Sequence, residues 1–286
     1  MPEIKVLPKA VAELIAAGEV VERPASVIKE LVENSIDAGS TMITVEIKNG
    51  GVTFIRVTDN GCGIKREFVA TAFLRHATSK VQNENDLEAI ATLGFRGEAL
   101  AAISSVSRVE MITKTKDSNI GSVFRAEGGN YVTVDDAGCP DGTTVIVRDL
   151  FFNTPARMKF LKKDVAEGNA VGAILDHIAL SHPEISFRFI RDGKNVFSSS
   201  GDGKLMSAIY AVCGREFASC LIPVECELGG MKLSGYTCLP TACRPKRNAQ
   251  FVFLNGRYVR SGTVAQALEV AYKNSAMVGR YPAYKD

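Results

Sequence analysis

The segment from Ser26 to Asp37 has an apolar periodicity that predicts a helix, and it carries three polar side chains in one stripe. With an advance of about 100° per residue, Glu30, Asn34 and Asp37 fall along one side of this helix, at the margin of its apolar face. An amide oxygen can ligate a hard cation, and a carboxylate one turn away can orient and deprotonate a water molecule. The stripe therefore suits metal-assisted hydrolysis, but the same pattern also occurs on a helix face that is simply solvated.

A second cluster stands at the end of the predicted strand 52–58, where Asp59 is followed by Asn60-Gly61-Cys62-Gly63. A carboxylate accepts hydrogen bonds and does not donate them, so Asp59 could accept one from the N6 amino group of adenine. Gly61 and Gly63 permit backbone torsions and close approaches that a side chain would block. An ordinary tight turn between a strand and a helix would favour the same residues.

A third cluster, Gly94–Leu100, places glycines just before a predicted helix. Such glycines leave backbone N–H groups open to an anion, which the positive end of the helix dipole also attracts. The cluster suits the phosphates of a nucleoside triphosphate. The preceding interval Arg75–Lys80 has the length and hydroxyl content of a mobile lid. A loop capped by glycine without any ligand is the alternative.

Other kinds of site are excluded by motifs that the sequence lacks. It has no G-x-x-x-x-G-K-[ST] phosphate loop, no strand-borne G-x-G-x-x-G, no H-E-x-x-H and no G-x-S-x-G, and His177 and His182 are interpreted as structural. The seven cysteines are scattered without a C-x-x-C pair, which indicates reduced thiols. No apolar run reaches about 18 residues and no secretory signal is visible, so we expect a cytoplasmic protein without a membrane span.

The elements that must position these clusters mix hairpins with helices. Runs 41–48 and 52–58 are joined by Asn49-Gly50-Gly51, which is a strong hairpin signal. Strand signals recur between 106 and 149, and a long helix beginning near 156 or 164 is expected to end at Leu180. This order favours an α+β sandwich over a doubly wound parallel sheet. The other predicted elements are helices at 66–74, 98–104, 204–213 and 262–274 and strands at 186–191, 195–199, 220–228, 231–238 and 249–254.

The stretch 198–203 is rich in serine and glycine, so we place a domain boundary between residues 202 and 203. The charge changes at the same point, because residues 201–286 hold 11 Lys and Arg against 6 Asp and Glu, whereas residues 1–200 hold 23 against 26. A basic second unit suggests an anionic polymer as partner, and a chance fluctuation of surface charge is the alternative. Its basic loop 244–247 and predicted turn 255–260 could contact phosphates or simply be solvated. The residues concerned are Lys246, Arg247, Arg257 and Arg260.

Taken together, the three clusters resemble the GHKL ATPases, the family that contains gyrase B, Hsp90 and the histidine kinases, and within it the mismatch-repair branch. The strings 94–100 and 153–157 are shared with that branch and not with the gyrase, Hsp90 or kinase members. The resemblance extends over essentially the whole chain. The segments that carry it are 15–24, 30–39, 59–63, 75–80, 94–100, 152–157 and 255–257.

The resemblance implies a GHKL (Bergerat) ATPase α/β sandwich over residues 1–202 and a domain like domain 2 of ribosomal protein S5 over residues 203–286. It implies ATP and Mg²⁺ as ligands, with Glu30 as the general base and Asn34 as the Mg²⁺ ligand. Asp59 would read the adenine amino group beside Gly63, with Thr143 assisting through a water molecule. The lid over the phosphates would comprise residues 78–80 and 94–98. The nucleotide-binding residues implied are Asn34, Asp37, Asp59, Gly61, Gly63, Thr78, Ser79, Lys80, Gly94, Phe95, Arg96, Gly97, Glu98, Ala99, Leu100 and Thr143.

The resemblance also implies a weak ATPase that acts as a switch in DNA mismatch repair. Its partners would be MutS, mismatch-containing and single-stranded DNA, a downstream nuclease and helicase, and a second copy of the chain in an ATP-dependent N-terminal dimer. The family continues into a His-Pro-Ala-Lys segment that does not follow here, so we expect a truncated second domain and reduced hydrolysis. The alternatives are a nucleotide- and DNA-binding fragment that does not hydrolyse ATP, and the ATPase subunit of a type II topoisomerase.

Overall fold

The computed structural model describes residues 17, 18, 20–79, 93, 94, 97–247, 249–277 and 279–285. The chain divides into two compact units, the first made of Met1–Leu175 with Ser186–Phe197 and the second of Asp176–Ile185 with Ser198–Asp286. The long helix α6 (Asp164–Ser181) contributes residues to both units. The second unit resumes inside the Ser/Gly-rich stretch in which the sequence analysis placed a boundary.

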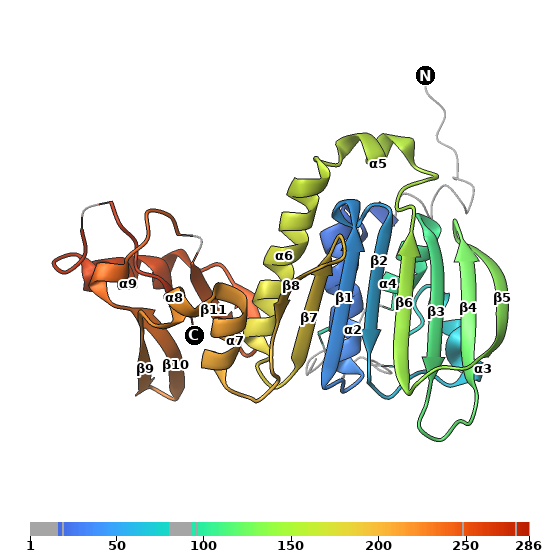
Figure 1. The fold of residues 1–286 in the computed structure, drawn as a ribbon, viewed down its shortest axis with the longest axis horizontal. Coiled ribbons are helices and arrows are strands. Elements are labelled where there is room, and N and C mark those ends of the chain that lie inside the picture. Colours follow the sequence, from blue (N-terminus) through green and yellow to red (C-terminus); the bar gives the residue numbers. More distant parts are fainter. Residues whose placement is uncertain are drawn as a thin grey trace. The chain divides into compact units, whose positions relative to one another are not determined.

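The first unit is built on an eight-stranded sheet with the order β5-β4-β3-β6-β2-β1-β7-β8 (Figure 1). Strand β1 pairs in parallel with β7, whereas its pair with β2 and the pairs among β2, β3, β4, β5 and β6 are antiparallel. The hairpin predicted over residues 41–58 is therefore confirmed. The strands are β1 (Met42–Lys48), β2 (Phe54–Asp59), β3 (Arg108–Lys114), β4 (Gly121–Glu127), β5 (Asn130–Ala137), β6 (Gly142–Arg148), β7 (Ser186–Arg191) and β8 (Lys194–Ser198).

Helices α2 (Pro24–Asp37) and α4 (Ala99–Ser105) cover one face of this sheet (Figure 1). The strand residues that face these helices are buried at alternate positions, as Val45 and Val57 illustrate. The other face carries partly exposed polar side chains, including an ion pair between Glu46 and Arg56. This alternation is typical of a sheet with one buried face, and the unit is the two-layer α/β sandwich that the sequence predicted.

Helix α2 begins at Pro24, two residues before the start predicted at Ser26. Proline is tolerated at the first helical position because its missing N–H would have no partner within the helix. Arg23, just before the helix, donates hydrogen bonds of 2.9–3.1 Å to the carboxylate of Glu167 on α6, whose side chain is almost fully buried. This contact joins the start of α2 to a residue 144 positions away.

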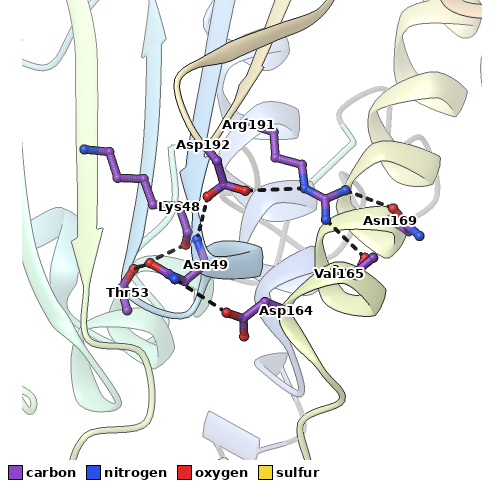
Figure 2. A network of polar contacts seen from close by, with 8 residues as sticks. All are labelled: Lys48, Asn49, Thr53, Asp164, Val165, Asn169, Arg191 and Asp192. Atoms are coloured by element: carbon purple, nitrogen blue, oxygen red, sulfur yellow. Dashed lines mark hydrogen bonds and ion pairs between the residues drawn. The ribbon is translucent and has the colours of Figure 1, made fainter.

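A polar network holds the turn η1 (Asn49–Gly51) against α6 and the β7–β8 turn (Figure 2). The Asn49 backbone N–H donates to Asp192 Oδ1 at 3.0 Å, and Thr53 Oγ1 donates to Asn49 Oδ1 at 2.9 Å. Arg191 in turn donates to Asn169 Oδ1 at 2.9 Å. The network holds the turn that leads into β2, and Asp59 lies at the opposite end of that strand.

The second unit contains a five-stranded sheet with the order β12-β11-β13-β10-β9. Its core includes Ile209, Phe217, Cys238 and Phe251, which are buried together. Burial next to the sulfur of Cys238 raises the pKa of the Cys243 thiol to about 11, so this thiol stays protonated at neutral pH. The elements are α7 (Leu205–Cys213), α8 (Arg215–Ala218), β9 (Leu221–Leu228), β10 (Met231–Cys238), η4 (Pro240–Ala242), β11 (Gln250–Leu254), β12 (Arg257–Val259), α9 (Gly262–Tyr272) and β13 (Tyr284–Lys285).

Two sequence predictions need correction. Residues 255–260 are not only a turn, because β12 returns from Asn255-Gly256 to pair with β11. The helix predicted over 66–74 is divided into α3 (Arg66–Val69) and η2 (Thr71–Phe73). The long helix has the later of its two predicted starts, because α6 begins at Asp164 and the short helix α5 (Pro155–Phe160) precedes it. The sequence also predicts a short helical stretch before Gly94, which lies outside the described residues. Within the described part of the chain, no helix is long and apolar enough to cross a membrane.

Candidate nucleotide site

The carboxylate of Asp59, at the end of β2, accepts hydrogen bonds from three separate segments. Ser35 Oγ on α2 donates to Oδ2 at 2.7 Å. The backbone N–H groups of Gly61 and Thr143 donate to Oδ1 at 2.9 and 3.2 Å. A carboxylate offers about four acceptor positions, so these bonds leave one position on Oδ2 for an external donor. An adenine amino group would be such a donor.

Thr143 is joined to a second threonine, Thr113 on β3, across the sheet. Their hydroxyl oxygens lie 3.0 Å apart, and Thr113 Oγ1 also accepts the Ile64 N–H at 2.9 Å. Thr113 Oγ1 lies 3.1 Å from the Gly142 carbonyl oxygen, which accepts its single proton. Thr143 must then donate to Thr113, and its own oxygen remains only an acceptor. A ring nitrogen of a base would therefore need a water molecule between itself and Thr143, as the resemblance implies.

Glycines let the backbone segments around Asp59 approach closely. Gly63 has φ +69°, and a Cβ built there would lie 2.2 Å from the Lys114 carbonyl oxygen. Gly142 has φ +110°, and its Cβ would lie 2.2 Å from the Asp59 carbonyl oxygen. A Cβ on Gly61 would meet Ser40 Oγ at 2.7 Å. No other residue fits these positions without displacing backbone, so the turn after Asp59 depends on glycine.

The predicted polar stripe of α2 is present. The Glu30 side chain is 29% exposed, and Lys29 Nζ lies 3.9 Å from its carboxylate but 3.1 Å from that of Glu33. Burial raises the pKa of the Glu33 carboxyl, and the neighbouring Lys29 counteracts part of that increase. Because Lys29 is closer to Glu33, the carboxylate of Glu30 retains capacity to bind a water molecule.

Asp37, the last residue of α2, holds the start of the glycine cluster. Its Oδ1 accepts the Leu93 N–H at 3.1 Å and its Oδ2 accepts the Gly94 N–H at 3.2 Å. The carboxylate thus anchors the loop, a role that its place in the predicted stripe did not indicate. Asn34 lies between Glu30 and Asp37 on the same helix, and Ser35 follows it with its bond to Asp59.

The two predicted lid segments contact each other. A Cβ on Gly97, which has φ +63°, would lie 2.6 Å from the Ala77 carbonyl oxygen. His76 Nδ1 lies 3.3 Å from a carboxylate oxygen of Glu98. Thr78 and Ser79 are exposed, and Ala99 and Leu100 form the start of α4. Lys80, Phe95 and Arg96 lie outside the described residues.

The donor set around α2 fits a magnesium ion that is bound mainly by phosphates. Among the described residues no group of three or more His, Cys, Asp or Glu side chains could hold a metal ion by itself. Mg²⁺ usually keeps several water molecules and binds one or two protein oxygens together with substrate phosphates. Asn34, which supplies a single amide oxygen, matches that mode.

The basic residues predicted to contact DNA lie on the second unit and differ in their surroundings. Lys246 and Arg260 are exposed. Arg247 instead donates two hydrogen bonds to Glu269 at 2.7 and 3.0 Å, and these bonds lower the pKa of the Glu269 carboxyl. Arg257 begins β12. The carboxylate of Glu269 would therefore compete with a phosphate for Arg247.

Profiles of two protein families match this chain. The family "Histidine kinase-, DNA gyrase B-, and HSP90-like ATPase" matches residues 22–127, which include α2 and Asp59. The family "DNA mismatch repair protein, C-terminal domain" matches residues 209–285. The DNA mismatch repair protein MutL of Agathobacter rectalis is 51% identical over 282 residues, which is 99% of this chain.

The chain belongs to the MutL family.

MutL of Symbiobacterium thermophilum is 48% identical over 99% of the chain. The chain spans 44% of the length of each of these two relatives. Among solved structures, the N-terminal domain of a DNA repair protein has a TM-score of 0.80 at 26% identity, covering 95% of this chain and 84% of that one. The MutL ATPase domain of Aquifex aeolicus complexed with ADP has a TM-score of 0.68 at 29% identity, covering 93% and 92%. The first unit thus has the ATPase fold of MutL.

Two residues of this site, Ser35 and Thr113, are not marked by any signal in the sequence. Ser35 lies next to Asn34 and has the small size expected of a buried helix residue, so nothing in the local pattern marked it. Thr113 is an ordinary strand residue by sequence. Ser35 contacts Asp59, 24 positions away, and Thr113 contacts Ile64, 49 positions away. A local sequence pattern contains no information about such contacts.

We predict that Gly63→Ala weakens nucleotide binding at least about tenfold and lowers the melting temperature, because the methyl group would collide with the Lys114 carbonyl. Gly39→Ala is the matched control, since Gly39 has a similar φ of +71° but nothing within 4 Å of its Cβ. That variant should show only the cost of backbone strain, about 1 kcal/mol. Calorimetric titration with ADP and thermal melting measure both effects. Equal losses of ADP affinity and of melting temperature in the two variants would contradict a role for the close contact between Gly63 and Lys114.

Proposed function

We propose that this chain binds ATP together with Mg²⁺ and hydrolyses it slowly, as a conformational switch in DNA mismatch repair. The observation that supports this most is the role of one helix, α2, in four tasks. It carries Glu30 and Asn34, its Ser35 binds Asp59, and its Asp37 binds the backbone of the glycine cluster. The residues proposed for base recognition, phosphate binding and water activation are thereby positioned by a single helix.

The residues divide the work by chemistry. Asp59 accepts the adenine amino group with its remaining Oδ2 position, and the backbone around Gly97 and Gly94 lies along the phosphates. Asn34 would supply an oxygen to Mg²⁺, and the ion would neutralise phosphate charge. Glu30 orients the attacking water molecule and takes its proton. The position of Lys29 nearer to Glu33 keeps Glu30 available for that role.

The switch function rests on the MutL relatives. We propose that closing of the lid segments 75–80 and 94–98 over ATP favours an N-terminal dimer, and that hydrolysis reopens it. In this role the protein would act in the cytoplasm with MutS, mismatch-containing and single-stranded DNA, and a downstream nuclease and helicase. Membership of the MutL family sets aside the alternative of a topoisomerase subunit. The alternative of a nucleotide- and DNA-binding fragment without turnover is decided by the experiment below.

Glu30→Ala should abolish ATP hydrolysis, by about a hundredfold or more, while ATP affinity stays nearly unchanged, because the base acts on water and not on the bound nucleotide. Asn34→Ala should weaken ATP binding only when Mg²⁺ is present. Glu67→Ala on α3, an exposed acid outside the site, is the control. Steady-state phosphate release and nucleotide titration give the two readouts. Hydrolysis by Glu30→Ala at the unmutated rate would show that another group is the base.

We further propose that the second unit contacts DNA phosphates through basic residues of the segments 244–247 and 255–260, among them Lys246 and Arg257. Lys246→Glu should lower DNA affinity and reduce the slope of log affinity against log salt by about one, as expected for the loss of one phosphate contact. Arg257→Glu should act in the same direction. Lys204→Glu, the same charge change at an exposed position in the same unit, serves as the control. An unchanged salt slope in both test variants would identify Lys246 and Arg257 as solvated surface residues.

A further inference from the structure

The two oxygens of the Asp59 carboxylate accept hydrogen bonds from different kinds of donor, and this difference bears on base specificity. Two of its donors, Gly61 and Thr143, use backbone N–H groups and both reach Oδ1. Oδ2 receives one bond, and that bond comes from a side chain, Ser35 Oγ. Oδ2 is also the oxygen with an acceptor position left for a ligand. The orientation of the ligand-facing oxygen therefore depends on a single hydroxyl group.

Ser35 is well placed to control that orientation. It lies on α2, is 4% exposed, and its hydroxyl has two possible acceptors, Asp59 Oδ2 at 2.7 Å and the Leu31 carbonyl oxygen at 3.2 Å. The hydroxyl proton of Ser35 is donated preferentially to Asp59 Oδ2, which is charged and nearer, because charge-assisted hydrogen bonds are shorter and stronger. The Leu31 carbonyl is four residues earlier in the same helix, so the serine does not need Asp59 to be satisfied. The helix therefore does not require the bond from Ser35 to Asp59, and we interpret that bond as serving the site.

Resting on the proposed ATP binding, we infer that Ser35 is a positioning residue that makes the site select adenine over 6-oxo purine bases. By occupying one acceptor position of Oδ2, it directs the other toward a donor. Adenine presents an N6 amino donor there, whereas hypoxanthine presents an oxygen that can only accept. A fixed carboxylate oxygen bonds the first base and repels the second.

Without the hydroxyl, Oδ2 has two open positions and the carboxylate can rotate about its remaining bonds through Oδ1. Water can then enter and bridge the carboxylate to either base. Removal of Ser35 Oγ therefore lowers the affinity for adenine nucleotides and relaxes the discrimination against hypoxanthine. A purely structural serine would lower both affinities by the same factor.

The test compares ADP and IDP (inosine diphosphate) binding to the full chain by calorimetric titration, so that hydrolysis does not interfere. We expect Ser35→Ala to reduce the ratio of ADP to IDP affinity by about tenfold, the effect of one hydrogen bond to a charged group. Ser107→Ala is the matched control, because Ser107 is fully buried and its hydroxyl donates to a carbonyl four residues earlier, that of Ile103, at 2.6 Å. This control should leave the ratio unchanged.

Ser35→Cys keeps the size of the side chain and offers a weaker donor, so it provides a second variant if the alanine protein is unstable. Its ratio should fall between those of the serine and alanine proteins. The role of Ser35 would be overturned if the unmutated chain prefers ADP over IDP and both variants keep the same ratio of ADP to IDP affinity. That result would leave the proposed function standing. Binding of neither nucleotide by the unmutated chain would overturn both.

Discussion

The hydrogen bonds to the Asp59 carboxylate are the interactions on which the arrangement of the candidate site depends. Its donors come from α2, from the turn after β2 and from β6, and the farthest of them lies 84 residues from Asp59 in the sequence. A partly buried carboxylate is costly unless hydrogen bonds satisfy it, so each of these segments is held where its donor can reach Asp59. The same bonds leave one oxygen position open, and that position gives the site its preference for a donor.

Helix α2 transmits this constraint to the rest of the site. Ser35 fixes its last turns against Asp59, and Asp37 binds the backbone of residues 93 and 94. At the other end of the helix, Arg23 binds the buried carboxylate of Glu167. A helix held at both ends is a rigid support for Glu30 and Asn34, and preorganised groups of this kind need no rearrangement during a reaction.

Sequence alone predicted the elements and the chemical clusters, but not how the clusters are joined. The stripe of Glu30 and Asn34 followed from helical periodicity, and Asp59 from its place at a strand end. The contacts of Ser35, Thr113 and Asp37 could not be predicted, because each joins residues that no local pattern relates. The strand β12 was a different kind of miss, since Asn255-Gly256 is itself a strong signal for a two-residue hairpin.

The central claim is that α2, the turn after Asp59 and the glycine cluster bind one nucleotide. A crystal structure of the chain with Mg²⁺ and a non-hydrolysable ATP analogue tests it most directly. The account predicts the adenine amino nitrogen within hydrogen-bonding distance of Asp59 Oδ2 and the phosphates between Asn34 and Gly97. An ordered nucleotide bound elsewhere, or with its base away from Asp59, would contradict the account.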